Sequence, residues 1–199
     1  MATVEATTET VLAELEACGA LKRGHFLLSS GLHSPAYVQC ALYLESPRRA
    51  GSAGAVIAAR LCAERIDTVL SPALGGVVIG YEVARALDVP FRFCEREGEK
   101  MALRRGFAIS PGERVAVVED VVTTGKSTLE TAALAEAAGA TVVAIGSIID
   151  RSGGRHGFRV PYAALVPLDL PTWTAADCPL CRDGSVAVKP GSRPQPAKA

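Results

Sequence analysis

The sequence predicts an α/β fold with a mostly parallel sheet that is covered by helices on both faces. Between residues 36 and 149, short apolar runs alternate with longer segments of helical periodicity. The runs at 115–118 and 141–149 are apolar almost throughout, which is typical of strands buried on both faces of a parallel sheet. Polar or glycine-rich segments follow several of these runs, at the sheet edge where open α/β folds bind ligands.

Length and composition indicate a single domain spanning residues 1–199. We expect a core at about 36–149 and a small hood, formed by residues 1–35 and 150–199, over the ligand site. The 21 basic and 21 acidic side chains cancel, which argues against a nucleic-acid partner. Membrane association is not expected, because no apolar run approaches the length of a membrane span. The N-terminus lacks the features of a signal peptide, so we expect a cytoplasmic protein.

The first half of the chain begins with an amphipathic pattern at residues 4–18, which predicts a helix ending at Gly19. Residues 20–37 suggest a hairpin with turns at Gly24 and Gly31. The next predicted elements are a helix at 47–65, a strand at 68–70, a helix at 77–87 and a strand at 89–93.

The segment 71–76 connects a strand to a helix and contains Gly75 and Gly76. Two glycines there would let the backbone approach an anion closely, and a tight turn is the less favoured alternative.

The second half opens with residues 95–107, which are dense in charge and typical of a solvated loop. The Pro- and Gly-rich stretch at 189–194 is expected to be frayed. The remaining predicted elements are a strand at 115–118, a helix at 129–138, a strand at 141–149 and a strand at 163–166.

The richest stretch is the acidic pair Glu119 and Asp120 with the polar loop that follows it, residues 123–127. Loop N–H groups and the start of the next helix suit a phosphate dianion, while the carboxylates suit vicinal ribose hydroxyls. A triphosphatase loop would require glycine in place of Asp120. An ordinary strand-to-helix turn would leave the two carboxylates without partners.

Two segments resemble the type I phosphoribosyltransferases. Residues 115–127 follow the phosphoribosyl-pyrophosphate (PRPP) motif of that family: four apolar residues, an acidic pair, two apolar residues, Thr, a small residue and Gly. Residues 26–37 are similar to the Phe-x-Leu-x-Ser-Gly-x-x-Ser-Pro-x-Tyr pattern of the orotate-specific members.

The resemblance implies transfer of phosphoribose from PRPP to orotate, giving orotidine 5′-monophosphate and pyrophosphate in de novo pyrimidine (UMP) synthesis. It further implies Mg²⁺ held mainly by PRPP, without direct side-chain ligation, and a homodimer with shared active sites. Two alternatives stay open: a phosphoribosyltransferase for another base, such as a purine, and a non-catalytic PRPP-sensing regulator.

The same resemblance assigns site residues. Residues 95–107 would form a mobile catalytic loop that supplies cations to the neighbouring subunit, with Arg104 and Arg105 as further candidates. Catalysis would involve Lys100, Glu119 and Asp120. Orotate would be bound by Tyr37, Thr123 and Arg151. PRPP would be bound by Arg96, Lys100, Glu119, Asp120, Val121, Val122, Thr123, Thr124, Gly125, Lys126 and Ser127. The sequence has Ser29 and Gly75 where many members carry lysine.

Cysteines and histidines suggest no metal site. Cys178 and Cys181 form a CxxC, which is half a zinc site without a second pair. A redox pair, a metal knuckle completed across a dimer, and a turn are all open; we expect a structural role without metal. His25 and His33 have no metal-ligand partner at useful spacing, so neither is assigned any chemistry. The remaining cysteines are expected to be small core residues: Cys18, Cys40, Cys62 and Cys94.

Overall fold

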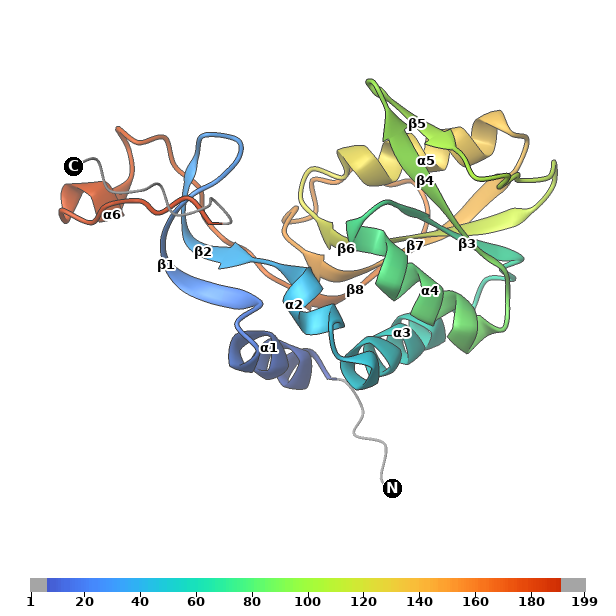
Figure 1. Ribbon diagram of the computed structural model, residues 1–199, viewed down its shortest axis with the longest axis horizontal. Helices are drawn as coiled ribbons and strands as arrows, with labels where there is room; N and C mark the ends of the chain where they lie inside the picture. Colours follow the sequence, from blue (N-terminus) through green and yellow to red (C-terminus); the bar gives the residue numbers. More distant parts are fainter. Residues whose placement is uncertain (1–6, 191–199) are drawn as a thin grey trace.

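A computed structural model describes residues 7–190 of the chain, which form a six-stranded sheet, a separate two-stranded sheet and six helices (Figure 1). In chain order the elements are α1 (Thr8–Ala17), β1 (Leu21–Leu27), β2 (His33–Val38), α2 (Cys40–Leu44), α3 (Pro47–Leu61), β3 (Thr68–Pro72), α4 (Gly75–Leu87), β4 (Phe91–Glu97), β5 (Lys100–Leu103), β6 (Arg114–Val122), α5 (Lys126–Ala137), β7 (Thr141–Asp150), β8 (Tyr162–Pro167) and α6 (Pro179–Arg182). None of the described helices is both long and apolar enough to cross a membrane.

The large sheet has the strand order β5-β4-β3-β6-β7-β8. All neighbouring strands are parallel except β4 and β5, which confirms the predicted mostly parallel sheet. From β3 the chain passes through α4 to β4 on one side, and later returns to β6 on the other side of β3. The strand order therefore reverses between β3 and β6, which is where such sheets open a ligand crevice.

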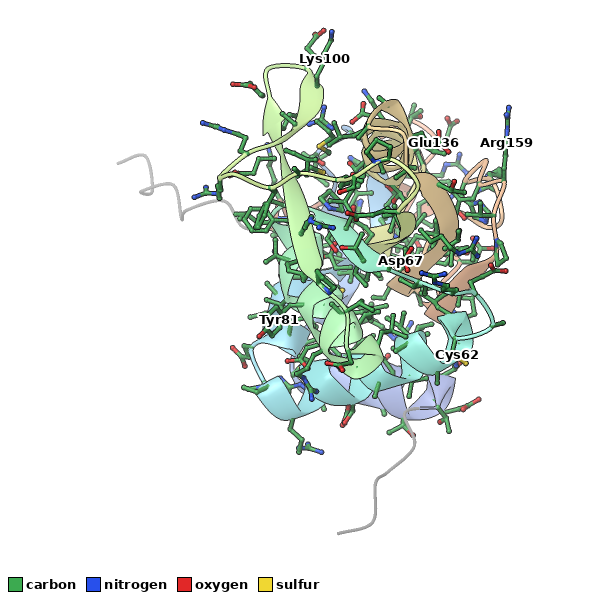
Figure 2. All side chains as sticks on the ribbon, turned by 90° about the vertical axis from the view of Figure 1, so that its right-hand side faces the viewer. Cys62, Asp67, Tyr81, Lys100, Glu136 and Arg159 are labelled. Atoms are coloured by element: carbon green, nitrogen blue, oxygen red, sulfur yellow. The ribbon has the colours of Figure 1, made fainter. Side chains whose placement is uncertain are left out.

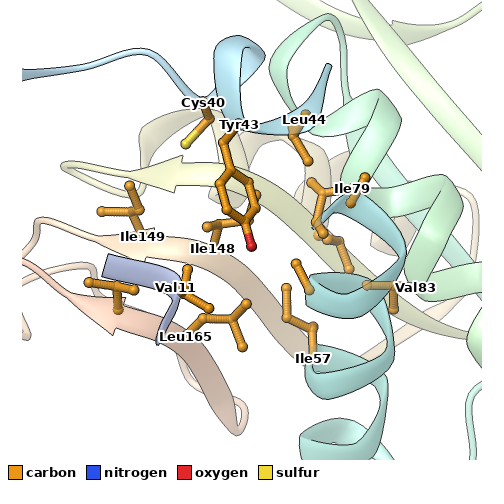
Figure 3. Packing of buried hydrophobic residues seen from close by; sticks show 14 of the residues in the cluster. Val11, Cys40, Tyr43, Leu44, Ile57, Ile79, Val83, Ile148, Ile149 and Leu165 are labelled. Carbon is orange, nitrogen blue, oxygen red and sulfur yellow. The ribbon is translucent and has the colours of Figure 1, made fainter. Parts of the chain in front are cut away.

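Helices cover both faces of this sheet, as predicted (Figure 1). Helix α5 lies on one face over a cluster that includes Val117 and Ala135, and α1 to α4 lie on the other face. Figure 3 shows Tyr43 of α2 among the side chains of the second face, next to Ile148. Its hydroxyl reaches Glu14 of α1 at 3.3 Å, so the deepest aromatic ring still has a polar partner.

The hood consists of β1, β2 and residues 168–190, which return to the hairpin from the end of the large sheet (Figure 1). The Val188 N–H donates to the His25 carbonyl at 2.9 Å, and the His33 N–H donates to the Trp173 carbonyl at 2.8 Å. The boundaries differ from those expected. Helix α1 and strand β8 pack with the core, because Val11 and Leu165 are buried in the larger cluster. Strands β1 and β2 contribute only Leu21 and Ala36 to its buried residues, and β2 pairs with β1 in the hood.

Several local predictions need correction. Gly24 is not a turn but part of a bulge in β1, where the register with β2 shifts between Arg23 and Phe26. Strand β6 continues through the acidic pair to Val122, because its pairing with β7 extends that far. The short helices α2 and α6 carry too few turns for a visible period and were not predicted.

The charged segment 95–107 was expected to be a loop, yet it contains a β-hairpin. Strand β4 runs on to Glu97, and the turn at Gly98, with φ of +60°, returns the chain into β5. The antiparallel register extends from Cys94 and Leu103 to Glu97 and Lys100. Two other predictions, the start of the first helix at residue 4 and fraying beyond residue 190, lie outside the described residues.

Candidate active site

The loop after β6 forms a compact cradle at the switch point. It leads into α5, whose first-turn N–H groups have no partner within the helix. Gly125 has φ of +77°, and a Cβ there would lie 2.8 Å from the His156 carbonyl oxygen, so only glycine fits this turn. The cradle holds about 60 Å³ and its lining is polar, as a phosphate group requires. Its lining residues are Glu119 and residues 121–128.

The two members of the acidic pair have different environments. Glu119 is only 7 % exposed, and its Oε1 accepts the Asp120 N–H at 3.2 Å. Burial and the neighbouring Asp120 charge raise the pKa of Glu119 to about 9, so this side chain is protonated at neutral pH. Asp120 is half-buried and lines a cleft of about 310 Å³ beside β3. Glu119 thus lines the cradle and Asp120 lines the cleft, and Asp120 is the more exposed of the two.

Gly75 is in direct contact with the Asp120 carboxylate. A Cβ on Gly75 would lie 2.5 Å from Asp120 Oδ1, which is closer than Cβ atoms approach other atoms in proteins. A Cβ on Gly76 would lie 2.9 Å from the Val118 carbonyl oxygen. The loop after β3 thus approaches the end of β6 as closely as backbone atoms allow, and with Asp120 in this position a lysine does not fit at residue 75.

A second cleft, of about 500 Å³, lies between the hood and the large sheet. It brings together Tyr37 of β2, Thr123 of the cradle and Arg151, the three residues predicted to bind a carboxylated base. Thr124, which was predicted to bind PRPP, also lines this cleft. Sequence reasoning did not assign the other lining residues to the base site, because they come from the β1–β2 turn and from segments without a pattern. These are Leu28, Ser29, Ser30, Leu32, Ser152, Arg155, Leu170 and Thr172.

Arg151 is a half-buried cation that forms no ion pair with the other residues that the structure describes. Its Nε atom is buried and has no hydrogen-bond partner among the described residues, and burial lowers its pKa. The adjacent Asp150 carboxylate is occupied, because it accepts the Ser152 N–H at 2.7 Å and the Ser152 hydroxyl at 2.6 Å. A buried guanidinium with open donors favours an anionic ligand with two oxygens in one plane.

The predicted loop cations lie apart from these clefts. Lys100 is exposed at the tip of the β4–β5 hairpin (Figure 2). Arg96 forms an ion pair with Glu130 of α5 and donates to the Glu99 carbonyl at 2.8 Å. Arg105 pairs with Glu95 at 2.8 Å. None of these cations lines the cradle or either of the two clefts in its own chain.

The cysteine and histidine predictions are partly wrong. Cys62 is exposed and not a core residue, whereas Cys40 and Cys94 are buried as expected. His25, His33, Cys178 and Cys181 gather in the hood, with one ligand atom from each lying within 4.8 Å of the others. Each histidine therefore does have possible metal-ligand partners, but the two cysteines are distant from it in the sequence.

Comparison with known proteins agrees with this geometry. A family model described as a phosphoribosyl transferase domain matches residues 49–157, more than half of the chain. The orotate phosphoribosyltransferase of Thermotoga maritima is 54 % identical over 179 residues, 90 % of this chain and 96 % of that protein. The orotate phosphoribosyltransferase of Caldanaerobacter subterraneus is 47 % identical over 185 residues, 93 % of this chain and 97 % of that protein.

A solved structure gives the same result at the level of the fold. The crystal structure of orotate phosphoribosyltransferase from Aeropyrum pernix matches with a TM-score of 0.66 and 26 % identity, covering 79 % of this chain and 93 % of that one. Together with the family match, the parallel sheet and its site at the switch point define the class of protein, an α/β phosphoribosyltransferase. The chain belongs to the phosphoribosyltransferase family, in its orotate phosphoribosyltransferase branch.

Proposed function

We propose that this chain transfers the 5-phosphoribosyl group from PRPP to orotate, in de novo pyrimidine (UMP) synthesis. The bond between ribose C1′ and the pyrophosphate oxygen breaks, and pyrophosphate leaves with the electron pair. A ring nitrogen of orotate bonds to C1′ and loses its proton, which gives orotidine 5′-monophosphate. The observation that carries the choice of orotate is the buried Nε of Arg151, which has no hydrogen-bond partner within residues 7–190. Arg151 shares its cleft with Thr123 of the phosphate cradle.

The chain supplies binding and charge and needs no nucleophile of its own. The cradle at 123–127 holds the 5′-phosphate, and Asp120 accepts hydrogen bonds from the ribose hydroxyls. Glu119, neutral and buried beside it, leaves Asp120 as the full negative charge next to the positive charge that develops on ribose. Both residues therefore keep the catalytic role expected of them, with different protonation states.

Specificity for orotate comes from the second cleft. Arg151 pairs with the orotate carboxylate, and Tyr37 and Thr123 contact the ring. Uracil, adenine and hypoxanthine carry no carboxylate and would leave the guanidinium unpaired, which argues against a purine substrate. A PRPP-sensing regulator that binds nucleic acid would need a basic surface, and the net charge of +0 argues against one.

Magnesium fits the cleft beside Asp120, because its charged lining residues, Glu45 and Asp120, offer only hard oxygen donors. Held mainly by PRPP oxygens, Mg²⁺ would neutralise the departing pyrophosphate. No lysine or arginine of the part of the chain that the structure describes lines this cleft. The remaining positive charge must therefore come from outside it, and the exposed Lys100, with Arg96 once released from Glu130, is our candidate.

A homodimer would supply that charge. Leu74, Val78 and Tyr81 lie at spacings of four and three residues at the start of α4, and their exposed fractions are 85 %, 44 % and 57 % (Tyr81 in Figure 2). An apolar stripe of this kind favours burial against a second copy of the chain. In that dimer the hairpin of one subunit reaches the cleft of the other. The six free cysteines support a cytoplasmic location.

The test of this function combines turnover with one substitution. The purified protein should convert orotate but not uracil or adenine in the presence of PRPP and Mg²⁺. Arg151→Ala should raise the KM for orotate by at least about 30-fold and leave that for PRPP nearly unchanged, since a lost buried charge pair costs about 2–5 kcal/mol. The exposed Arg159→Ala is the matched control (Figure 2). Equal effects on both substrates would remove Arg151 from the base site.

A further inference from the structure

The hood contains four metal-ligating side chains that the reaction does not use. His25 lies in β1 and His33 in β2. Cys178 directly precedes the short helix α6, and Cys181 lies within it. His25, His33 and Cys178 are buried and Cys181 is half-buried. Their ligand atoms all lie within 4.8 Å of one another, although the cysteines are some 150 residues away from the histidines in the chain.

Three sulfur–nitrogen distances within this cluster match those of a tetrahedral metal site. His25 Nε2 lies 3.4 Å from Cys178 Sγ and 3.8 Å from Cys181 Sγ, and His33 Nδ1 lies 3.3 Å from Cys181 Sγ. Zinc bonds of about 2.3 Å to sulfur and about 2.0–2.1 Å to nitrogen place neighbouring ligand atoms roughly 3.3–3.8 Å apart. The two histidine nitrogens, at 2.8 Å, need to separate only slightly.

Ser185 orients the imidazole of His25 in the way that a metal site requires. His25 Nδ1 lies 3.1 Å from the Ser185 carbonyl oxygen and 3.2 Å from the Ser185 hydroxyl. The carbonyl can only accept, so Nδ1 carries the proton and Nε2 turns its lone pair toward the two thiols. Ser185 therefore acts as an outer partner that sets the tautomer of a ligating imidazole.

The segment that carries the cysteines, residues 168–190, has almost no buried side chains to stabilise it. Among residues 168–190, all of which the structure describes, Cys178 is the only buried residue. A two-stranded hairpin is marginally stable alone, and a segment without an apolar core commonly needs a metal or a disulfide. Both thiols here are free, and two imidazoles complete the set, which favours a metal over a disulfide.

We propose that His25, His33, Cys178 and Cys181 bind one structural Zn²⁺ that joins β1, β2 and the α6 segment into one unit. Two thiolates and two neutral imidazoles form a closed site without an open position for catalysis. The ion is distinct from the Mg²⁺ that accompanies PRPP, because its ligands are sulfur and nitrogen and they lie outside both clefts. The site would fold the hood, and it takes no part in phosphoribosyl transfer.

The experiment measures metal content in full-length protein purified with a thiol reductant. We expect about one zinc per chain by elemental analysis, and loss of the metal in Cys178→Ser and Cys181→Ser. The matched control, Cys62→Ser, removes an exposed thiol outside the cluster and should keep the metal. Zinc-free wild-type protein, or a Cys178–Cys181 disulfide in the reduced preparation, would overturn the proposal.

A second measurement avoids dependence on variants that fold poorly. Wild-type protein exchanged into Co²⁺ should show the intense ligand-field bands of a tetrahedral ion and a thiolate-to-cobalt charge-transfer band. A chelator should lower the melting temperature of wild type and not change that of Cys178→Ser further. Weak octahedral cobalt bands without charge transfer would mean that the cluster holds no metal, and would refute the assignment.

Discussion

Glu119 and Asp120 are neighbours in β6, yet their side chains face opposite environments. Alternation along a strand turns Glu119 toward the buried side, against the glycine loop after β3, and leaves Asp120 at the cleft. Two adjacent carboxyl groups cannot both ionise freely in this space, so the buried one, Glu119, keeps its proton. The motif therefore combines one neutral and one charged carboxyl group at the point where ribose is expected to bind.

This arrangement predicts a pH dependence of stability. Because the folded pKa of Glu119 lies above its ordinary value of 4.5, its proton contributes stability that is fully present below about pH 4.5 and is lost as the pH rises toward 9. Glu119→Gln is neutral at every pH. The free energy of unfolding, measured by urea denaturation, should therefore fall less between about pH 5 and pH 8 in Glu119→Gln than in wild type. The exposed Glu136→Gln should retain the wild-type slope (Figure 2).

A steeper decline in Glu119→Gln than in wild type would contradict the protonated state of Glu119. Equal slopes in all three proteins would show that the pKa of Glu119 does not differ between the folded and unfolded chain.

At the scale of elements, the contact between the β3–α4 loop and β6 sets the position of Asp120. Gly75→Ala would place a Cβ 2.5 Å from Asp120 Oδ1, and the carboxylate can escape because it faces a cleft. We expect turnover to fall up to about 100-fold, because a displacement of about 1 Å at a catalytic group can cost that much, with little change in melting temperature. Gly51→Ala in α3, whose Cβ would meet only the flexible ends of Arg85 and Glu82, is the control.

Full turnover in Gly75→Ala, with Asp120 confirmed as essential, would show that the contact with Gly75 does not position the carboxylate.

Most strands of the large sheet were predictable, because burial of a strand requires a run of apolar residues that is visible in the sequence. The apolar run at 115–118 and the helical period after it follow directly from strand and helix packing inside a two-faced sheet. Strand β5 gave no such signal, because its charged residues form a strand only through pairing with β4. The family motif located Tyr37, Thr123 and Arg151, but Leu170 and Thr172 reach the cleft through tertiary folding alone.

The His/Cys cluster was missed for the same reason. Metal-ligand spacing is recognisable when both pairs are close in sequence, whereas His25 and Cys178 meet across 153 positions. The antiparallel register of β1 and β2 and the return of residues 168–190 bring them together, and neither can be inferred from local pattern.

For the whole molecule, the proposed dimer makes a quantitative prediction. Lys100→Ala and Asp120→Asn are each expected to be inactive, and Asp120→Asn should fold normally because its side chain faces a cleft. Unfolding, mixing and refolding the two variants gives about half mixed dimers. One site of each mixed dimer then combines an intact hairpin with an intact Asp120, so roughly one quarter of wild-type turnover should return.

Each variant refolded alone is the control, and mixed dimers should be demonstrated with a charge tag on one variant. If mixed dimers form and turnover stays absent, each hairpin serves its own subunit and the shared-site model fails.

The hood joins the two ends of the described chain, and this has a consequence for synthesis on the ribosome. Leu27 and His25 exchange hydrogen bonds with Val188, and His25 meets Ser185 across 160 positions. The hairpin emerges early, at a translation rate of roughly 5–20 residues per second, whereas Ser185 follows His25 by 160 positions. The sheet from β3 to β8 can form during elongation, whereas the base cleft also needs Leu170 and Thr172, which are made after β8. A stalled nascent chain would thus carry the phosphate cradle before it could select a base.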